Sequence, residues 1–231
     1  ISAEELEHYR KEAERIHSDT DKAILLTLPG ASFGDIAMVP AVWAKNPKGI
    51  RDIEEWYIST VSRKDYVYRV FDRQCTIAIE NAKRIHSVVG ERASVVLYSA
   101  ADFGTQRAPF ISSQSYRELY KPFHRRLNDW IHTNTSWKVF IHTCGAIVPL
   151  IEDLIEAGFD ILNPVQCNAA EMDPGRLKEK FGDRLSFWGG GVDTQRTLPF
   201  GPAEQVRSEV RDRINIFWQN GGFGFHSIHH I

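Results

Sequence analysis

The chain has 231 residues, of which 42% are hydrophobic and 25% are charged, and 28 Lys and Arg against 30 Asp and Glu leave a net charge of −2. No apolar run approaches the roughly 20 residues that span a membrane, and no charged-then-apolar leader opens the chain, so we expect neither a membrane protein nor an exported precursor. The mixed, near-neutral charge argues against a nucleic-acid-binding protein. Three cysteines do not form a disulfide framework and favour a reducing, cytoplasmic compartment.

The first 90 residues predict a helix, a buried strand and two further helices. Ser2 and Glu5 have the spacing of a capping box at the start of the first helix. The continuous apolar run at 23–28 is typical of a strand that is buried on both faces. Apolar residues recur at helical intervals between about 49 and 89, which indicates two helices, the second ended by Gly90.

From residue 94 onward, predicted strands and helices alternate regularly. The strands are expected at 94–98, 138–141, 159–162 and 185–188 and from Gly222 onward. The helices between them are expected from about 112 to 132 with a kink at Pro122, around 150–155, at 174–181 and after Pro202. About six parallel strands covered by helices follow from this pattern, which leaves open whether the sheet is doubly wound or closes into a barrel.

Both ends of the chain look cut, which leaves room for the two further strands that a barrel would need. The chain starts at Ile1, and it stops inside an apolar, strand-like run at 229–231. A length of 231 residues is slightly below the roughly 250 that are typical of an eight-stranded α/β barrel. We therefore expect residues 1–231 to form one incomplete domain that is truncated at both ends.

Polar and glycine-rich segments follow the predicted strands directly, at their carboxyl ends. These segments are 99–104, 142–145, 163–167, 189–193 and 226–230. The carboxyl ends of parallel strands share one rim, where α/β enzymes build their sites. We therefore expect Asp102, His142, Gln166, Asp193 and His229 to converge on one cleft.

His142 and Cys144 are the strongest candidates for metal ligands on this rim. They lie two residues apart on an extended segment, so their side chains point to the same side, and imidazole with thiolate is a ligand pair suited to zinc. Further ligands would come from neighbouring segments: the candidates are Cys167, His226, His229 and Asp193. The alternative is that Cys144 is a small buried hydrophobic residue and that His142 is only hydrogen-bonded, since His-x-Cys alone is a weak motif.

Other rim residues have two interpretations each. Asp102 and Asp193 could bind a cationic or N–H-bearing substrate, although Asp193 could equally order a turn. His226 and His229 lie on opposite faces of the last strand, so at most one of them points into the barrel without a bulge. The three glycines at 189–191 indicate close backbone approach to a ligand rather than a standard phosphate loop.

The sequence resembles the uroporphyrinogen decarboxylase superfamily over most of its length. The resemblance rests on DFGTQRAPFIS (102–112), YKPFH (120–124), FIHTCG (140–145), DILNPVQ (160–166), MDP (172–174) and FWGGGVDTQ (187–195). It implies a (β/α)8 TIM barrel with its cleft at the carboxyl ends of the strands. It also implies additional chain before the equivalent of Ile1 and a further helix after the equivalent of Ile231.

The superfamily implies two competing activities. In its cobalamin-dependent methyltransferases, a His-x-Cys motif and a distant Cys hold zinc, which activates a thiol to accept a methyl group from a corrinoid. His142 and Cys144 match the first half of this motif, but His229 stands near the expected position of the distant Cys. The decarboxylases are cofactor-free and use arginines, an aspartate, a tyrosine and a late histidine. His229 matches the late histidine, whereas Asp102 stands in the region expected to supply the tyrosine.

The presence of Cys144 favours the methyltransferase-like branch, and a non-catalytic corrinoid- or tetrapyrrole-binding barrel is a third hypothesis. The predicted metal ligands are His142, Cys144, Cys167 and His229. The predicted catalytic residues are Asp102, Asp193 and His229, and the predicted substrate-binding residues are Gln166, Gly190, Gly191 and His226. The expected partners are a small-molecule or tetrapyrrole substrate, a corrinoid protein and a second copy of the chain in a homodimer.

Overall fold

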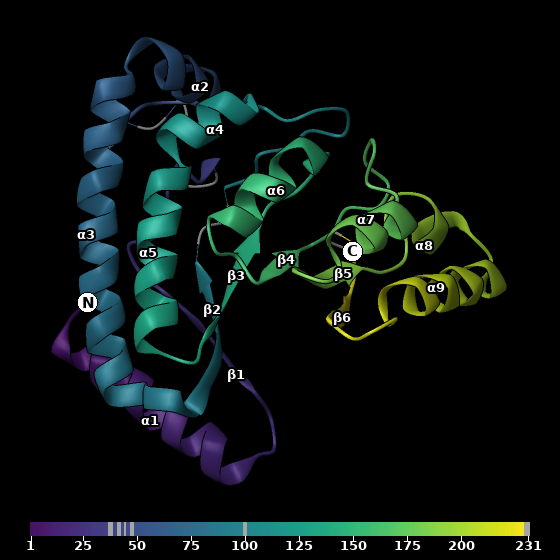
Figure 1. Cartoon of the computed structure of the whole chain (residues 1–231), viewed down its shortest axis with the longest axis horizontal. Helices are drawn as coiled ribbons and strands as arrows, with labels where there is room; N and C mark the ends of the chain where they lie inside the picture. Colours follow the sequence, from purple (N-terminus) through teal and green to yellow (C-terminus); the bar gives the residue numbers. More distant parts are fainter. Residues whose placement is uncertain (37–38, 41–42, 44, 47–48, 99–100, 229–231) are drawn as a thin grey trace.

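A computed structural model describes residues 1–36, 39–40, 43, 45–46, 49–98 and 101–228 (Figure 1). The elements, in chain order, are α1 (Ala3–Asp19), β1 (Ile24–Thr27), α2 (Ile53–Ser62), α3 (Lys64–Val89), the 3-10 turn η2 (Gly90–Arg92), β2 (Ala93–Tyr98), α4 (Ser113–Leu119), α5 (Lys121–Asn134), β3 (Lys138–His142), α6 (Val148–Glu156), β4 (Ile161–Asn163), α7 (Pro174–Phe181), β5 (Ser186–Gly190), α8 (Thr197–Phe200), α9 (Ala203–Phe217) and β6 (Phe223–His226). None of these helices has the length and apolar character needed to cross a membrane.

The six strands form one parallel sheet in the order β1-β2-β3-β4-β5-β6, so each strand pairs with the next along the chain. Figure 1 shows α3 and α5 along one side of the molecule and α7, α8 and α9 at the other end of the sheet. This is the curled arrangement of a (β/α) barrel, which confirms the predicted fold class. In such a sheet all carboxyl ends lie on one rim, and the loops after the strands meet there.

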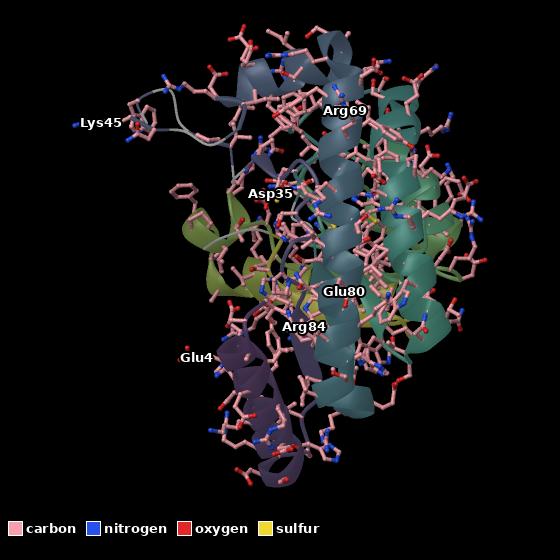
Figure 2. The ribbon with its side chains drawn as sticks, turned by 90° about the vertical axis from the view of Figure 1, so that its left-hand side faces the viewer. Glu4, Asp35, Lys45, Arg69, Glu80 and Arg84 are labelled. Atoms are coloured by element: carbon pink, nitrogen blue, oxygen red, sulfur yellow. The ribbon has the colours of Figure 1, made fainter. Side chains whose placement is uncertain are left out.

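The helix α3 illustrates how the sequence produces this layer. Its buried residues recur every three or four positions and include Val67, Phe71, Cys75, Ala78, Ala82, Ile85 and Val89. Its outer face carries charged side chains such as Arg69 and Glu80 (Figure 2). Arg84 donates from Nη1 to the main-chain oxygen of Ile1 over 2.5 Å, which ties the start of α1 to α3. The capping box predicted at Ser2 and Glu5 is also present.

The prediction of one kinked helix from about 112 to 132 is wrong, because the structure has two helices, α4 and α5, separated at Tyr120. Pro122 lies in the first turn of α5, where a residue without an N–H leaves no hydrogen bond unmade. The proline therefore begins a new helix instead of bending a continuous one. The strand predicted at 159–162 also shifts to Ile161–Asn163, and the short helix α8 was not predicted.

A buried histidine lies in the aromatic core between α5 and the sheet. His124 is 0% exposed, and its ring makes edge contacts with Phe33 and Phe159. Its Nδ1 is 2.9 Å from the Tyr116 hydroxyl, whereas its Nε2 has no hydrogen-bond partner among the described residues. Burial lowers the pKa of His124 to about 3, because the charged imidazolium loses its hydration there.

This burial predicts a pH-dependent stability. The unfolded chain binds a proton at this residue below about pH 6.5 and the folded protein does not, so the free energy of unfolding falls as the pH drops from about 6.5 towards 3. The contribution of His124 is about 1.4 kcal/mol per pH unit. We expect His124→Gln to flatten this slope in urea unfolding at pH 7, 6, 5 and 4. Equal slopes in wild type and His124→Gln would contradict the prediction.

Candidate metal-binding site

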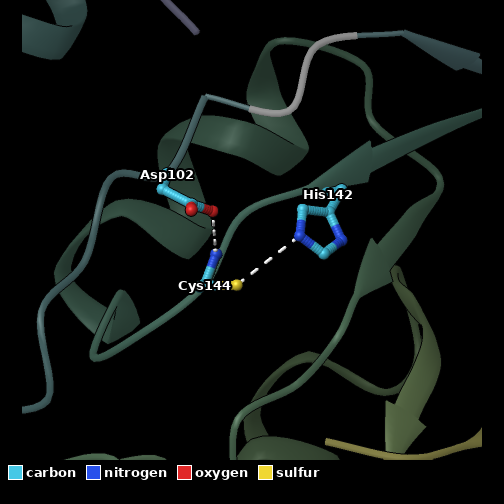
Figure 3. Close-up of side chains that lie close together, drawn as sticks. All are labelled: Asp102, His142 and Cys144. Carbon is cyan, nitrogen blue, oxygen red and sulfur yellow. Dashed lines mark hydrogen bonds between the residues drawn. The ribbon is translucent and has the colours of Figure 1, made fainter. Parts of the chain in front are cut away.

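Three side chains from two neighbouring loops converge at the carboxyl-terminal rim (Figure 3). Asp102 follows β2, His142 is the last residue of β3, and Cys144 lies two residues further on. Their potential ligand atoms all lie within 4.8 Å of one another. The Cys144 Sγ is 3.5 Å from His142 Nε2, and Asp102 Oδ1 accepts a hydrogen bond of 2.8 Å from the Cys144 main-chain N–H. The sequence predicted His142 and Cys144 as a ligand pair, and the structure places Asp102 beside them.

Two glycines make this convergence possible. A Cβ at Gly145, which has φ +88°, would lie 2.3 Å from the main-chain carbon and oxygen of Gly104. A Cβ at Gly104 would lie 2.7 Å from the Cys144 carbonyl oxygen. Contacts this short to backbone atoms exclude a side chain at either position. The loops after β2 and β3 therefore touch through their backbones, and this contact brings Asp102 up to Cys144.

Buried polar contacts fix the two loops in this position. Gln166, which is 4% exposed, accepts a 2.9 Å hydrogen bond from the Gly145 N–H through its Oε1. The hydroxyl of Thr143 accepts from the Phe103 N–H over 3.0 Å. Gln166 was predicted to bind substrate, but in the structure its side-chain oxygen holds the loop that carries Cys144. Its role towards a substrate stays a prediction.

Burial and charge both disfavour ionisation of the Cys144 thiol. Cys144 is 8% exposed, and burial together with the negative charge and hydrogen-bond contact of Asp102 raises its pKa to about 12. Cys144 contacts His142, and His142 contacts Asn163, as the nucleophile, base and orienting amide do in a cysteine-based catalytic triad. The Asp102 carboxylate opposes formation of the Cys144 thiolate that a triad requires, whereas a bound divalent cation would favour this thiolate. The arrangement is therefore better suited to binding a metal than to nucleophilic catalysis.

The structure separates Cys167 from this group. Its thiol donates to the main-chain oxygen of Val165 over 3.3 Å, and burial raises its pKa to about 12. The potential metal-binding group found among the described residues does not include it. The predicted ligand and catalytic residue His229 lies outside the described residues, as does His230.

Asp193 orders a turn, which is one of its two predicted roles. Its Oδ1 accepts main-chain hydrogen bonds from Gln195 (2.7 Å) and Arg196 (3.1 Å) and a side-chain hydrogen bond from Asn168 (3.1 Å). His226 ends β6 with an exposed side chain whose Nδ1 is 2.9 Å from the Ser227 carbonyl oxygen. The catalytic role of Asp193 and the substrate-binding role of His226 stay predictions.

The three consecutive glycines at 189–191 pack against protein atoms. A Cβ at Gly189 would overlap the Pro164 carbonyl oxygen. A Cβ at Gly190 would lie 2.6 Å from the Phe217 ring, and one at Gly191 would lie 2.4 Å from the His226 carbonyl oxygen. The structure thus gives a packing reason for these glycines. The substrate-binding roles predicted for Gly190 and Gly191 stay untested.

Two residues beside the site were not predicted from the sequence. Asn163 Oδ1 lies 2.5 Å from His142 Nδ1, and the Tyr57 hydroxyl donates to the Asp102 main-chain oxygen over 3.2 Å. Asn163 directly follows the strand predicted at 159–162, and this position at a strand end could have marked it as a site residue. Tyr57 lies in α2, far from any strand end, and no local pattern marks it.

The family model for uroporphyrinogen decarboxylase matches residues 47–231, which is most of the chain. No curated protein matches the sequence. A solved structure of a methyltransferase from Methanosarcina mazei matches with a TM-score of 0.65 and 16% sequence identity, over 96% of this chain and 58% of that chain. At this identity the match shows a shared fold, and the chain spans 58% of the length of that structure.

The glycine contact predicts a specific effect of substitution. Gly145→Ala should destabilise the protein by about 2–4 kcal/mol, because the new methyl group meets the Gly104 backbone and the residue keeps a positive φ. The matched control is Gly221→Ala, at φ +77° with open space around the Cβ, which should cost about 1 kcal/mol. The measurement is the free energy of unfolding in urea. Equal losses in the two variants would show that the contact between the loops is not tight.

Proposed function

Because the chain belongs to the uroporphyrinogen decarboxylase family, we propose that it is an enzyme of the family's methyltransferase-like branch. In this proposal His142, Cys144 and Asp102 hold a zinc ion, and the enzyme moves a methyl group between a corrinoid and a thiol or small methyl donor. The observation that carries the proposal is the convergence of three donor atoms of different chemistry within 4.8 Å. The solved methyltransferase with the same fold supports it at the level of architecture.

The donor set fits zinc. Catalytic zinc sites commonly use three protein ligands drawn from nitrogen, sulfur and oxygen donors and leave a fourth position for water or substrate. A thiolate and a carboxylate together carry two negative charges, which a divalent cation neutralises. The same cation would remove the conflict between the Asp102 carboxylate and the Cys144 thiol that raises the pKa of Cys144. Of the two other predicted ligands, Cys167 directs its thiol to the Val165 main-chain oxygen, and His229, outside the described residues, remains a candidate for the fourth position.

The residues of the chain have distinct roles in this site. Zinc, when bound, would lower the pKa of a coordinated substrate thiol and leave it a strong nucleophile. Asp102 uses one carboxylate oxygen to hold the Cys144 N–H, so its other oxygen is free of that contact and available as a ligand. Cys144 is nearly buried, so the protein limits the access of water to the sulfur. Gln166 holds the loop that carries Cys144, directly after the strand that ends at His142.

A decarboxylase acting on a tetrapyrrole is the second candidate, and one observation favours it. The resemblance implies a tyrosine near the substrate and places Asp102 in the region expected to supply it. Asp102 presents a carboxylate at the rim, and the Tyr57 hydroxyl lies against its main chain. This reading requires no metal, so a metal-free protein that decarboxylates a tetrapyrrole would overturn the methyltransferase proposal.

The proposal predicts the zinc affinity of three variants. Cys144→Ser and Asp102→Asn should each lower the affinity for zinc at least about tenfold, since even groups that only support a metal ligand have effects of this size. The measurement is competition with a chromophoric chelator at fixed pH, together with the zinc content of the purified protein.

Cys167→Ser is the matched control, because it changes a partly buried rim thiol that donates to a main-chain oxygen instead of facing His142. We expect its zinc affinity to stay within about twofold of the wild type. A tenfold loss in Cys167→Ser with no loss in Asp102→Asn would assign the third ligand to Cys167. Equal zinc content in wild type and Cys144→Ser would contradict the proposed site as a whole.

A further inference from the structure

We propose that Asn163 is a positioning residue of the metal site, which holds His142 in the tautomer that is able to bind a metal through Nε2. The effect on metal binding rests on the proposed function, whereas the tautomer of His142 is a property of the metal-free protein. It is carried by a line of contacts that runs from Cys144 through His142 and Asn163 to the main chain of Trp188.

The orientation of the Asn163 amide follows from its two partners. Asn163 is 7% exposed, and its Nδ2 donates a 2.7 Å hydrogen bond to the main-chain oxygen of Trp188. A carbonyl oxygen only accepts hydrogen bonds, so the amide nitrogen must face Trp188 and the amide oxygen must face His142. The oxygen lies 2.5 Å from His142 Nδ1. Since an amide oxygen has no hydrogen to donate, Nδ1 must carry the proton of this contact.

The protonation of Nδ1 determines the state of the other ring nitrogen. A neutral imidazole carries one N–H, so Nε2 is left with a lone pair. That atom is the one that faces Cys144, with the sulfur at 3.5 Å. A metal ion between the sulfur and Nε2 would thus find an unprotonated nitrogen already directed towards it. Without the Asn163 acceptor the ring would also populate the tautomer with hydrogen on Nε2, which does not bind a metal through that atom.

The sheet holds Asn163 rigidly at this point. His142 and Asn163 are register partners in the β3–β4 ladder, so their side chains leave neighbouring strands on the same face. The Asn163 main-chain oxygen accepts the Thr143 N–H over 2.8 Å, immediately beyond His142. Trp188 lies on β5, the next strand of the sheet. Three consecutive strands therefore contribute one group each to the contacts that orient the imidazole.

The test compares two substitutions of Asn163 with a matched control. Asn163→Leu removes the acceptor, and Asn163→Asp keeps an oxygen acceptor for the His142 Nδ1–H. The control is Asn128→Leu, because Asn128 is also buried and also bridges a side chain and a main-chain oxygen, accepting from Tyr98 (2.6 Å) and donating to Ala157 (2.8 Å), away from the site. The readouts are the imidazole ¹⁵N signals of His142 in the metal-free protein, assigned with His142→Gln, and the zinc affinity.

In the metal-free wild type we expect the Nδ1–H tautomer of His142. Asn163→Asp and Asn128→Leu should keep it, whereas Asn163→Leu should populate the Nε2–H form and bind zinc at least about tenfold more weakly. The inference is overturned by an Nε2–H tautomer in the wild type, by an unchanged tautomer in Asn163→Leu, or by an equal loss of affinity in Asn128→Leu. If the wild type binds no zinc, the proposed function fails, and the ¹⁵N spectra still decide the role of Asn163. The wild-type spectrum decides it even if Asn163→Leu does not fold.

Discussion

The site depends on one hydrogen bond, in which the Asp102 carboxylate accepts the main-chain N–H of Cys144. This contact holds a negative charge beside a thiol that burial already keeps neutral. The carboxylate opposes ionisation of this thiol in the absence of a cation, and the rest of the structure holds the two groups together. It does so through the Gln166 and Thr143 hydrogen bonds and through the direct contact of two loop backbones. In the proposed function, this arrangement is a cation site that the fold assembles in advance.

The barrel architecture explains why these residues meet. Parallel strands place the loops after β2, β3 and β4 next to one another on the same rim, although Asp102 and Gln166 are far apart in the sequence. The ends of these strands and the loops that follow them supply different types of group: a carboxylate, an imidazole with a thiol, and two amides. The helices behind the sheet contribute mainly packing, as the buried aromatic core around His124 shows. The positions of the functional groups are therefore set by the sheet, and the helices stabilise it.

Much of the fold could be predicted from the sequence, because continuous apolar runs and helical periodicity are local signals. The rim and the His142–Cys144 pair were predicted from position alone, since both follow a strand. Local patterns did not separate the two helices at Tyr120, because a proline in a first turn and a proline at a kink look alike in sequence. The role of Asn163 depends on a neighbouring strand and the main chain of a third, which no spacing reveals. The close packing of the glycines at 189–191 against Pro164, Phe217 and His226 likewise depends on distant parts of the chain, so no local pattern reveals it.

The contact between Gly104 and Gly145 also constrains how the sequence can vary. Each missing Cβ is excluded by main-chain atoms of the other loop and not by a side chain that a second substitution might shorten. No compensating replacement at the partner position relieves the clash, because both positions already carry the smallest residue. Neither glycine can therefore be replaced by a larger residue while the two loops keep this contact. In a related sequence, a side chain at either position would indicate that these loops are spaced differently and that a site of this geometry is absent.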